Sequence, residues 1–348
     1  VINGNYLPAS YDADNKGRIT HWAAMAIKAK IYLFEGNWTQ VKNITSTIMT
    51  EGGFKLFGSY AGLFEIANEY NSEVILDAQY RPTSREHQMM YVFLPPTLGG
   101  YSQLSPLQEL VDSYIMLDGK TIKETGTSFD ESHPYANRDP RLKATVMYTG
   151  NSYTLADGTE VVINCEKGEG KDGYGVGSDC SATGYYIKKY WDNTYRATLY
   201  SGLNPILIRY ADILLMNAEA LAELGELDKT AWDATIKPIR DRAGFTLASA
   251  LEFPEGASKD KLIEIVRNER RSELALEGHR HKDIIRWRIA DNVLNGWCHG
   301  LKTNDVIGTD DGHVRVENRT FNANRHYLWP IPQAERDLNG NLEQNPNW

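Results

Sequence analysis

Three features are scarce in this sequence of 348 residues: long apolar runs, cysteine and excess positive charge. Because no run reaches 18 apolar residues, we expect no transmembrane helix. Lys and Arg number 37 against 46 Asp and Glu, and the formal net charge of −9 argues against a nucleic-acid partner. The chain starts at Val1 without a signal-peptide pattern, so we expect a processed or truncated chain whose membrane attachment, if any, comes from outside these residues.

The three cysteines are Cys165, Cys180 and Cys298, and their spacing matches no zinc-binding or redox pattern. A bridge between Cys165 and Cys180 would close a glycine-rich loop and is sterically possible. Free thiols are at least as compatible with a chain of this size. The sequence leaves both alternatives open.

Motifs that carry chemistry are also missing. The sequence has no nucleophile elbow, phosphate-binding loop or dinucleotide fingerprint, and the glycine-rich stretch 168–177 lacks the flanking strand, Lys-Ser/Thr pair and helix that such a loop needs. The acidic run 309–312 lacks the alternating ligands of an EF-hand. No carboxylate pair stands out as the acid and base of a glycosidase. We therefore predict a protein that is not an enzyme and has neither a cofactor nor a metal.

Aromatic residues are abundant, with 20 Tyr and 8 Trp. Each of these side chains offers a flat apolar face and a hydrogen-bonding tip, which suits the apolar C–H faces and hydroxyl rims of sugars. Most single aromatics still serve packing. The excess favours a carbohydrate ligand without identifying its site.

Apolar periodicity predicts a helical hairpin over residues 20–51, with Thr20 as the N-cap and a turn at Gly36. Small residues at Ala23, Ala26 and Ala29 would let two antiparallel helices approach closely, as in a tetratricopeptide unit. Such a unit cannot bury its apolar face alone, so we expect further helices to pack against it.

Further helices are predicted in the last third of the chain. A second hairpin begins near residue 206, stops at Gly225 and continues over 232–243, where Pro238 bends or interrupts it and Gly244 ends it. Residues 259–276 and 283–294 are also expected to be helical, with a break at Gly278.

Residues 53–205 have a different character, because Gly, Ser, Asn, Asp and Tyr increase there and only short strands are indicated, at 73–78 and 144–148. Long irregular segments in a compact domain commonly carry function. We therefore predict a mainly α protein: a tetratricopeptide-like hairpin at 1–52, a loop-rich ligand-binding region at 53–205 and a helical region at 206–348.

Five blocks in a fixed order resemble the SusD/RagB family. Together they are far more specific than any one of them, and they cover nearly the whole chain. The blocks are 16–18 (KGR) with the helix and turn up to 38, 105–119 (SPLQELVDSY…DG) with 137–142 (NRDPRL), 208–220 (IRYADILLMNAEA), 267–280 (RNERR…EGHR) and 328–346 (LWPIP…E…QNP).

The resemblance implies tetratricopeptide-like helices that carry an irregular ligand-binding half. It also implies a lipid-anchored protein at the outer membrane of Bacteroidetes-type bacteria, which binds glycans and delivers them to a SusC-like TonB-dependent transporter. Family members usually have additional N-terminal helices and a lipidated cysteine, and neither precedes residue 16 here. We expect part of the ligand surface and the anchor to lie outside this chain.

The stretch 267–286 is rich in charged residues. A metal-binding or acid–base site is one interpretation of its acids and histidines, which are Glu269, Glu273, Glu277, His279 and His281. Histidines two residues apart on a helix diverge by about 200°, so they cannot point at one ion. Arginines alternate with the acids, and a structural ion-pair network explains the cluster better. The run 138–141 (RDPR) is interpreted in the same way, as a turn fixed by charge.

Candidate ligand-binding residues are the aromatics of the loop-rich region and their polar neighbours. Tyr101 is the best placed, because the preceding glycines let the backbone approach a ligand and leave the ring exposed. The resemblance marks the region and not the individual residues. The further candidates are Tyr91, Trp191, Tyr195, Tyr200, Asn193 and Arg196.

Two other functions remain possible for the same architecture. One is a receptor for peptides or other nutrients, and the second is a helical-repeat scaffold that docks to the transporter without a ligand of its own.

Overall fold

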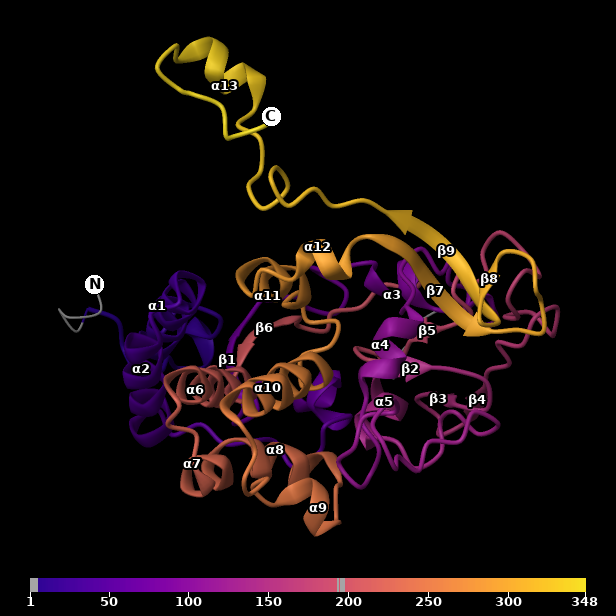
Figure 1. The fold of residues 1–348 in the computed structure, drawn as a ribbon, viewed down its shortest axis with the longest axis horizontal. Coiled ribbons are helices and arrows are strands. Elements are labelled where there is room, and N and C mark those ends of the chain that lie inside the picture. The colour runs from indigo at the N-terminus through magenta and orange to yellow at the C-terminus, as the bar shows by residue number, and fades with distance from the viewer. Residues whose placement is uncertain (1–5, 193, 195–197) are drawn as a thin grey trace.

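The computed structural model describes residues 6–192, 194 and 198–348 of the protein. Its helices pack side by side in one half of the molecule, while short strands and loops form the other half (Figure 1). The predicted mainly α fold with short strands is confirmed. The helices of the first half are α1 (His21–Glu35), α2 (Trp38–Glu51), α6 (Tyr210–Leu224), α7 (Lys229–Ala234), α8 (Ile236–Ala243), α9 (Ala248–Leu251), α10 (Lys259–Glu273), α11 (Arg280–Arg286) and α12 (Ala290–Val293).

The predicted first hairpin is present as α1 and α2. The Thr20 hydroxyl accepts a hydrogen bond from the Ala23 amide at 3.1 Å, and Gly36 ends α1 in a left-handed conformation with φ 69°. Ala23, Ala26 and Ala29 are fully buried where α1 packs on α2 and α6. Small side chains therefore set the close approach of these helices.

The prediction that the second hairpin begins near residue 206 was wrong for its first four residues. Ile206–Arg209 form strand β6, which pairs antiparallel with β1 (Val74–Asp77). The β-branched residues Ile206 and Ile208 are buried on this ladder. Helix α6 starts at Tyr210, and Gly225 caps its end, as expected for the end.

The predicted helix 232–243 is interrupted, and the break lies at Thr235 rather than at Pro238. A proline clashes with the carbonyl four residues before it, which here belongs to Ala234. Thr235 leaves helical geometry with φ −125°, and Pro238 falls in the first turn of α8, where its missing N–H costs nothing. Gly244 ends α8 with φ 103°.

The other two predicted helices are shorter than expected. α10 ends at Glu273 rather than at residue 276, because Leu276 already has φ 63°. The stretch 283–294 divides into α11 and α12, and Arg288 between them has φ 55°. These left-handed residues mark corners that apolar periodicity does not reveal.

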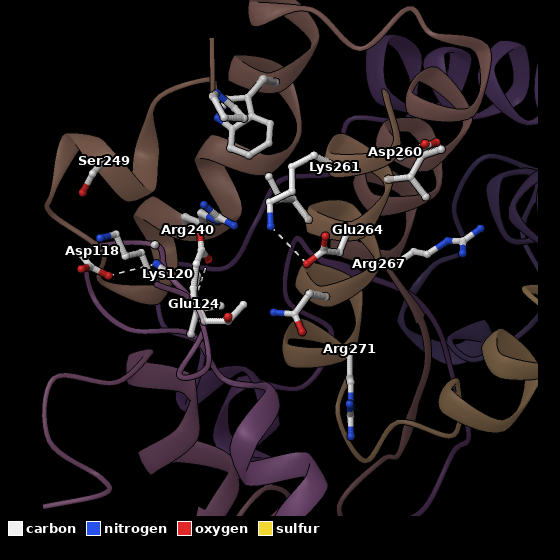
Figure 2. Close-up of a pocket in the computed structure, with 18 of the residues that line it drawn as sticks. Asp118, Lys120, Glu124, Arg240, Ser249, Asp260, Lys261, Glu264, Arg267 and Arg271 are labelled. Carbon is white, nitrogen blue, oxygen red and sulfur yellow. Dashed lines mark hydrogen bonds and ion pairs between the residues drawn. The ribbon is translucent and has the colours of Figure 1, made fainter. Parts of the chain in front are cut away.

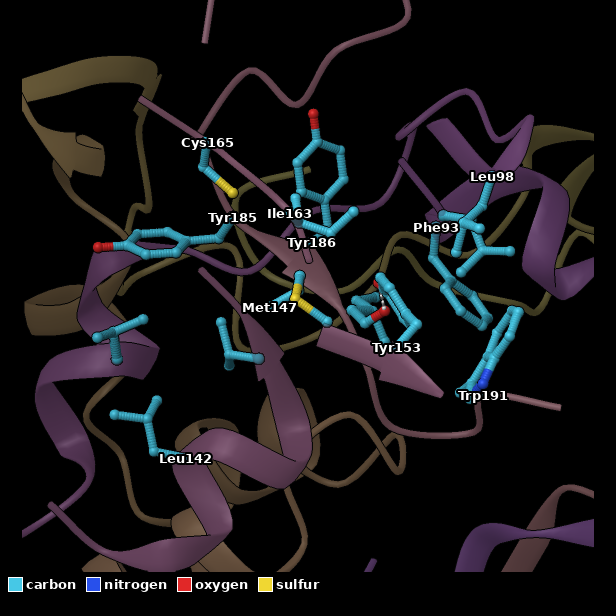
Figure 3. Packing of buried hydrophobic residues seen from close by; sticks show 14 of the residues in the cluster. Phe93, Leu98, Leu142, Met147, Tyr153, Ile163, Cys165, Tyr185, Tyr186 and Trp191 are labelled. Atoms are coloured by element: carbon cyan, nitrogen blue, oxygen red, sulfur yellow. Dashed lines mark hydrogen bonds between the residues drawn. The ribbon is translucent and has the colours of Figure 1, made fainter. Parts of the chain in front are cut away.

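The loop-rich half is held by a core of aromatic and aliphatic side chains (Figure 3). Tyr153 and Tyr186 are fully buried there, and the Tyr153 hydroxyl donates to the Ile187 carbonyl at 2.7 Å. The two predicted strands are present as β1 and, in shortened form, β2. Further elements, of which η2 precedes α1, are 3₁₀ helices η2 (Ala13–Asn15), η3 (Gly62–Phe64), η4 (Ile66–Asn68) and η5 (Pro96–Leu98), helices α3 (Met89–Phe93), α4 (Gln108–Ser113) and α5 (Pro140–Thr145), and strands β2 (Val146–Met147), β3 (Ser152–Thr154), β4 (Glu160–Val162) and β5 (Tyr186–Ile187).

A three-stranded sheet in the last third of the chain was not predicted. Strands β7 (Gly296–Lys302) and β9 (His313–Arg319) form a long antiparallel hairpin, and the short β8 (Thr309–Asp310) pairs with β9. The sheet belongs spatially to the loop-rich half (Figure 1). After β9 the chain projects from the body as an arm that ends with α13 (Gln333–Leu338).

Candidate functional site

Two predicted ligand-binding residues, Tyr91 and Tyr101, form an aromatic pair. Their ring centroids lie 4.4 Å apart with planes inclined by 33°, and the Tyr101 amide donates to the Tyr91 carbonyl at 2.9 Å. Gly99 turns the chain with φ 82°, and at Gly100 an added Cβ would lie 2.1 Å from the Leu94 carbonyl oxygen. Both glycines are therefore required locally, and they leave the Tyr101 side chain 39% exposed.

The loops around this pair are joined by hydrogen bonds. The Thr97 amide donates to Asp172 at 2.7 Å, which ties the Tyr101 loop to the glycine-rich segment. Ser201 pairs with His87 through two backbone hydrogen bonds, so Tyr200, which directly precedes Ser201 and is 41% exposed, adjoins a position fixed just before α3. Hydrogen bonding to Tyr101 raises the pKa of Tyr91.

Trp191 has a different environment from the tyrosine pair. Its side chain is 9% exposed, packs edge-on against Tyr153 at 5.2 Å and donates its indole N–H to the Thr154 carbonyl at 2.8 Å. Trp191 is thus a core residue (Figure 3). The candidates Asn193, Tyr195 and Arg196 lie outside the described residues.

A cavity of about 1800 Å³ lies beside the β7–β9 hairpin and contains aromatics that sequence reasoning missed. Tyr135 and Tyr148 stack there at 3.9 Å with planes 16° apart, and the Tyr135 hydroxyl donates to that of Tyr185 at 3.3 Å. One wall is fixed by His299 of β7, whose ring nitrogens contact Glu109 at 2.7 Å and an aspartate of β8 at 3.0 Å. In the sequence, only the high number of tyrosines indicated that aromatic surfaces such as the Tyr135–Tyr148 stack exist.

A second cavity, of about 800 Å³, lies along α10 (Figure 2). Arg267 and Arg271 line it from α10, whereas Asp118, Lys120 and Glu124 lie on the opposite side. α10 also contributes Asp260 and Glu264, so both sides of the cavity carry charges of both signs.

The ion-pair network expected from 267–286 is confirmed, and it is buried. Arg141 of α5 contacts Asp139 at 2.7 Å, Glu269 at 2.7 Å and Glu273 at 2.9 Å. Asp139 also caps α5, which confirms the turn fixed by charge at 138–141. The network joins the two halves of the molecule through buried side chains that pair with one another, so we assign it to the scaffold.

The same network continues around Arg209 of β6. Its guanidinium contacts Glu73 and Glu277 at 2.7 Å each, and Lys189 contacts Glu277 at 2.6 Å. Burial opposes ionisation of Glu277, but Arg209 and Lys189 outweigh it and lower its pKa to about 2. Burial likewise lowers the pKa of His279 to about 4, so this histidine is neutral at physiological pH.

The remaining predictions concern cysteines and membrane spans. Cys165, Cys180 and Cys298 are all free thiols, which decides the alternative left open by the sequence. Within 6–192, 194 and 198–348, none of the helices combines the length and apolarity needed to cross a membrane. In the same described part of the chain, His, Cys, Asp and Glu form no group of three that could hold a metal ion.

Comparison with known proteins identifies the family. A family model described as the SusD family matches residues 63–348. SusD-like protein P25 of Formosa agariphila is 28% identical over 313 residues, which cover 83% of this chain and 54% of that protein. The chain spans about half the length of the curated relatives it matches.

Two solved structures show the same fold. A SusD-like carbohydrate-binding protein from Bacteroides fragilis superimposes with a TM-score of 0.84 at 30% identity, over 97% of this chain and 68% of that one. Another SusD-like protein from Bacteroides fragilis gives a TM-score of 0.80 at 28% identity, over 98% and 68%. The fold is that of the SusD-like proteins, and the chain belongs to the SusD family. The first of these solved relatives is described as a carbohydrate-binding protein, which agrees with the prediction that the chain is not an enzyme.

Proposed function

We propose that this protein captures a glycan at the cell surface without cleaving it, and that Tyr101 supported by Tyr91 provides the stacking surface. The observation that carries the proposal is the exposed Tyr101 ring, fixed by a glycine turn and by its contact with Tyr91 at 4.4 Å. A rigid aromatic face binds a sugar ring at low entropic cost. Family membership supports carbohydrate as the ligand.

Residues 53–205 are the proposed ligand-binding region, because the tyrosine pair and its hydrogen-bonded loops lie there. Tyr200 extends the surface from a neighbouring segment. The cavity beside the β7–β9 hairpin adds a second aromatic surface with polar rims, formed by Tyr135 and Tyr148. A polymeric ligand has several rings, and separate aromatic surfaces suit such a ligand.

Delivery to a SusC-like TonB-dependent transporter and attachment to the outer membrane through an N-terminal lipid are further parts of the proposal. Both rest on the family resemblance. The protein would then hold the glycan above the transporter at the cell surface. Pull-down of a transporter from outer-membrane extracts by the tagged full-length protein would test this partnership, and recovery of no transporter under conditions that preserve glycan binding would argue against it.

Isothermal titration calorimetry with neutral and acidic oligosaccharides tests the main proposal. We expect saturable binding of at least one glycan and no release of shorter products at high protein concentration. Binding of peptides but of no glycan would favour the peptide-receptor alternative. A stable complex with the transporter but without any ligand affinity would favour the scaffold alternative.

Replacement of Tyr101 tests the site itself. We expect Tyr101→Ala to weaken glycan binding by about 1–3 kcal/mol, the typical loss of an aromatic anchor, and to leave the unfolding midpoint nearly unchanged because the ring is exposed. Tyr6→Ala is the matched control, since Tyr6 is 79% exposed and far from this loop in sequence. Equal affinities of both variants and the wild type would remove Tyr101 from the site.

A further inference from the structure

Buried arginines in this protein follow a rule: their guanidinium groups contact carboxylates. Arg138 departs from it, but its donors are satisfied by the carbonyls of Val111, Tyr114 and Pro134. Burial of a charge without a partner is costly, so the rule has a physical basis. The arginines that follow it are Arg141, Arg209, Arg240, Arg242, Arg270 and Arg286.

Arg271 and Arg280 are partly buried and differ from these arginines. Arg271 donates one hydrogen bond, to the backbone carbonyl of Glu109, while the Glu109 carboxylate is turned to His299. Arg280 has neither an ion pair nor a hydrogen bond to any residue that the structure describes. Burial and the nearby positive charge of Arg280 lower the pKa of Arg271 to about 10. The two guanidinium groups line the same cavity and are partly buried. Asp283, the acid that acts on Arg280, is already paired with Arg270 and Arg286, so Arg280 has no carboxylate to itself.

Both arginines line one end of the 800 Å³ cavity along α10. Trp287 forms part of the same end, with the Arg267 guanidinium 4.9 Å and the Arg280 guanidinium 6.0 Å from its ring centre. Arg267 contacts Glu223 at 3.0 Å, and its Nε is buried without a partner. Three guanidinium groups therefore face this end with one carboxylate between them.

Apart from Glu223, the acids that line the cavity are Asp118, Glu124, Glu252, Asp260 and Glu264. Asp118 and Glu124 are on the opposite side (Figure 2), where they accept hydrogen bonds from the Lys120 and Thr121 amides. Glu264 is paired with Lys261 at 3.2 Å. Among the contacts of the described residues, Asp118, Glu124 and Glu264 reach neither Arg271 nor Arg280.

We propose that this end of the cavity binds an oxyanion, either a carboxylate or a sulfate group, between Arg271 and Arg280. A guanidinium group offers a planar fork of N–H donors that matches two oxygens of such a group, and charge-assisted bonds of this kind are about twice as strong as neutral ones. The anion can be a free ion or the acidic group of a sugar residue. The site is distinct from the Tyr91–Tyr101 pair and does not rest on the proposed function.

Calorimetric titration with sodium sulfate, sodium glucuronate and glucose tests the site, in a buffer free of phosphate and at constant ionic strength. We expect saturable binding of sulfate or glucuronate and none of glucose. Arg280→Gln should weaken anion binding by about tenfold or more. Arg319→Gln is the matched control, because Arg319 lies on β9, is partly buried like Arg280 and is paired with Glu317 at 2.9 Å. It should bind like the wild type.

The outcomes separate the two sources of the anion. Binding of glucuronate with a dependence on Arg280 assigns the site to acidic sugars, and binding of sulfate alone assigns it to a sulfate group or free ion. Arg271→Lys, which keeps the charge but loses the fork, should weaken binding as well. Because Arg280 makes no hydrogen bond in the described structure, Arg280→Gln should fold even if Arg271→Lys does not. The absence of saturable binding of either anion, or equal affinities in Arg280→Gln and Arg319→Gln, would overturn the proposal.

Discussion

Removal of one buried charge should destabilise the whole molecule. Glu273 of α10 is 0% exposed and contacts Arg209 at 2.6 Å, Arg141 at 2.9 Å and also Arg242. These arginines come from β6, α5 and α8, so one carboxylate joins the two halves of the molecule. Although burial opposes ionisation, Arg242, Arg209 and Arg141 outweigh it and hold the pKa of Glu273 well below its usual range.

The substitution Glu273→Gln keeps the size of the side chain and removes its charge. Arg209 and Arg242 retain Glu73, and Arg141 retains Asp139 and Glu269, so the loss is partly compensated. Breaking a buried ion pair by removing one partner typically costs about 3–5 kcal/mol. We take about 3 kcal/mol, the lower end, as the expected loss of unfolding free energy.

Urea denaturation followed by circular dichroism measures this loss as a lower transition midpoint at an unchanged slope. The control is Glu252→Gln, because Glu252 forms solvent-exposed pairs with Lys229 and Lys237, and we expect its midpoint to match the wild type. If Glu273→Gln unfolds at the same urea concentration as Glu252→Gln, the network does not hold the halves together as described.

Two further predictions follow from particular contacts. Gly100→Ala should reduce glycan affinity without loss of helical content, because the new Cβ would meet the Leu94 carbonyl oxygen at 2.1 Å and displace the Tyr101 loop. Calorimetry on the variant measures its glycan affinity, and an affinity equal to that of the wild type would contradict the prediction. Arg209 and Lys189 lower the pKa of Glu277 from 4.5 to about 2, so the stability gained from its ionised form is present above pH 4.5 and lost as the pH falls toward 2. Urea midpoints over this pH range should therefore change less for Glu277→Gln than for the wild type, and equal pH dependence would refute the assignment.

Local signals predicted the helical half well because each of them has a local cause. Thr20 caps α1, Gly36 and Gly225 end helices in left-handed conformations, and buried alanines mark the contact of α1 with its neighbours. By contrast, the sequence around Ile206 carries no local sign that its partner strand lies some 130 residues earlier, at Val74. Apolar periodicity therefore mistook β6 for the start of a helix.

The candidate site was predictable only in part for a similar reason. Glycines before Tyr101 correctly indicated an exposed ring, since their effect is local. The stacking of Tyr135 on Tyr148 and the burial of Trp191 depend on contacts between distant segments, and no spacing encodes them. The cluster at 267–286 revealed its ion pairs, but the missing partners of Arg271 and Arg280 emerged only from the three-dimensional arrangement.

Saturation-transfer NMR with a bound oligosaccharide tests the central claim most directly, because it reports which sugar protons contact the protein. The glycan that binds the wild-type protein in calorimetry should show its strongest transfer on the C–H protons of one ring face, and Tyr101→Ala should lose that pattern while Tyr6→Ala keeps it. Uniform transfer over the sugar, unaltered in Tyr101→Ala, would contradict capture on this tyrosine surface.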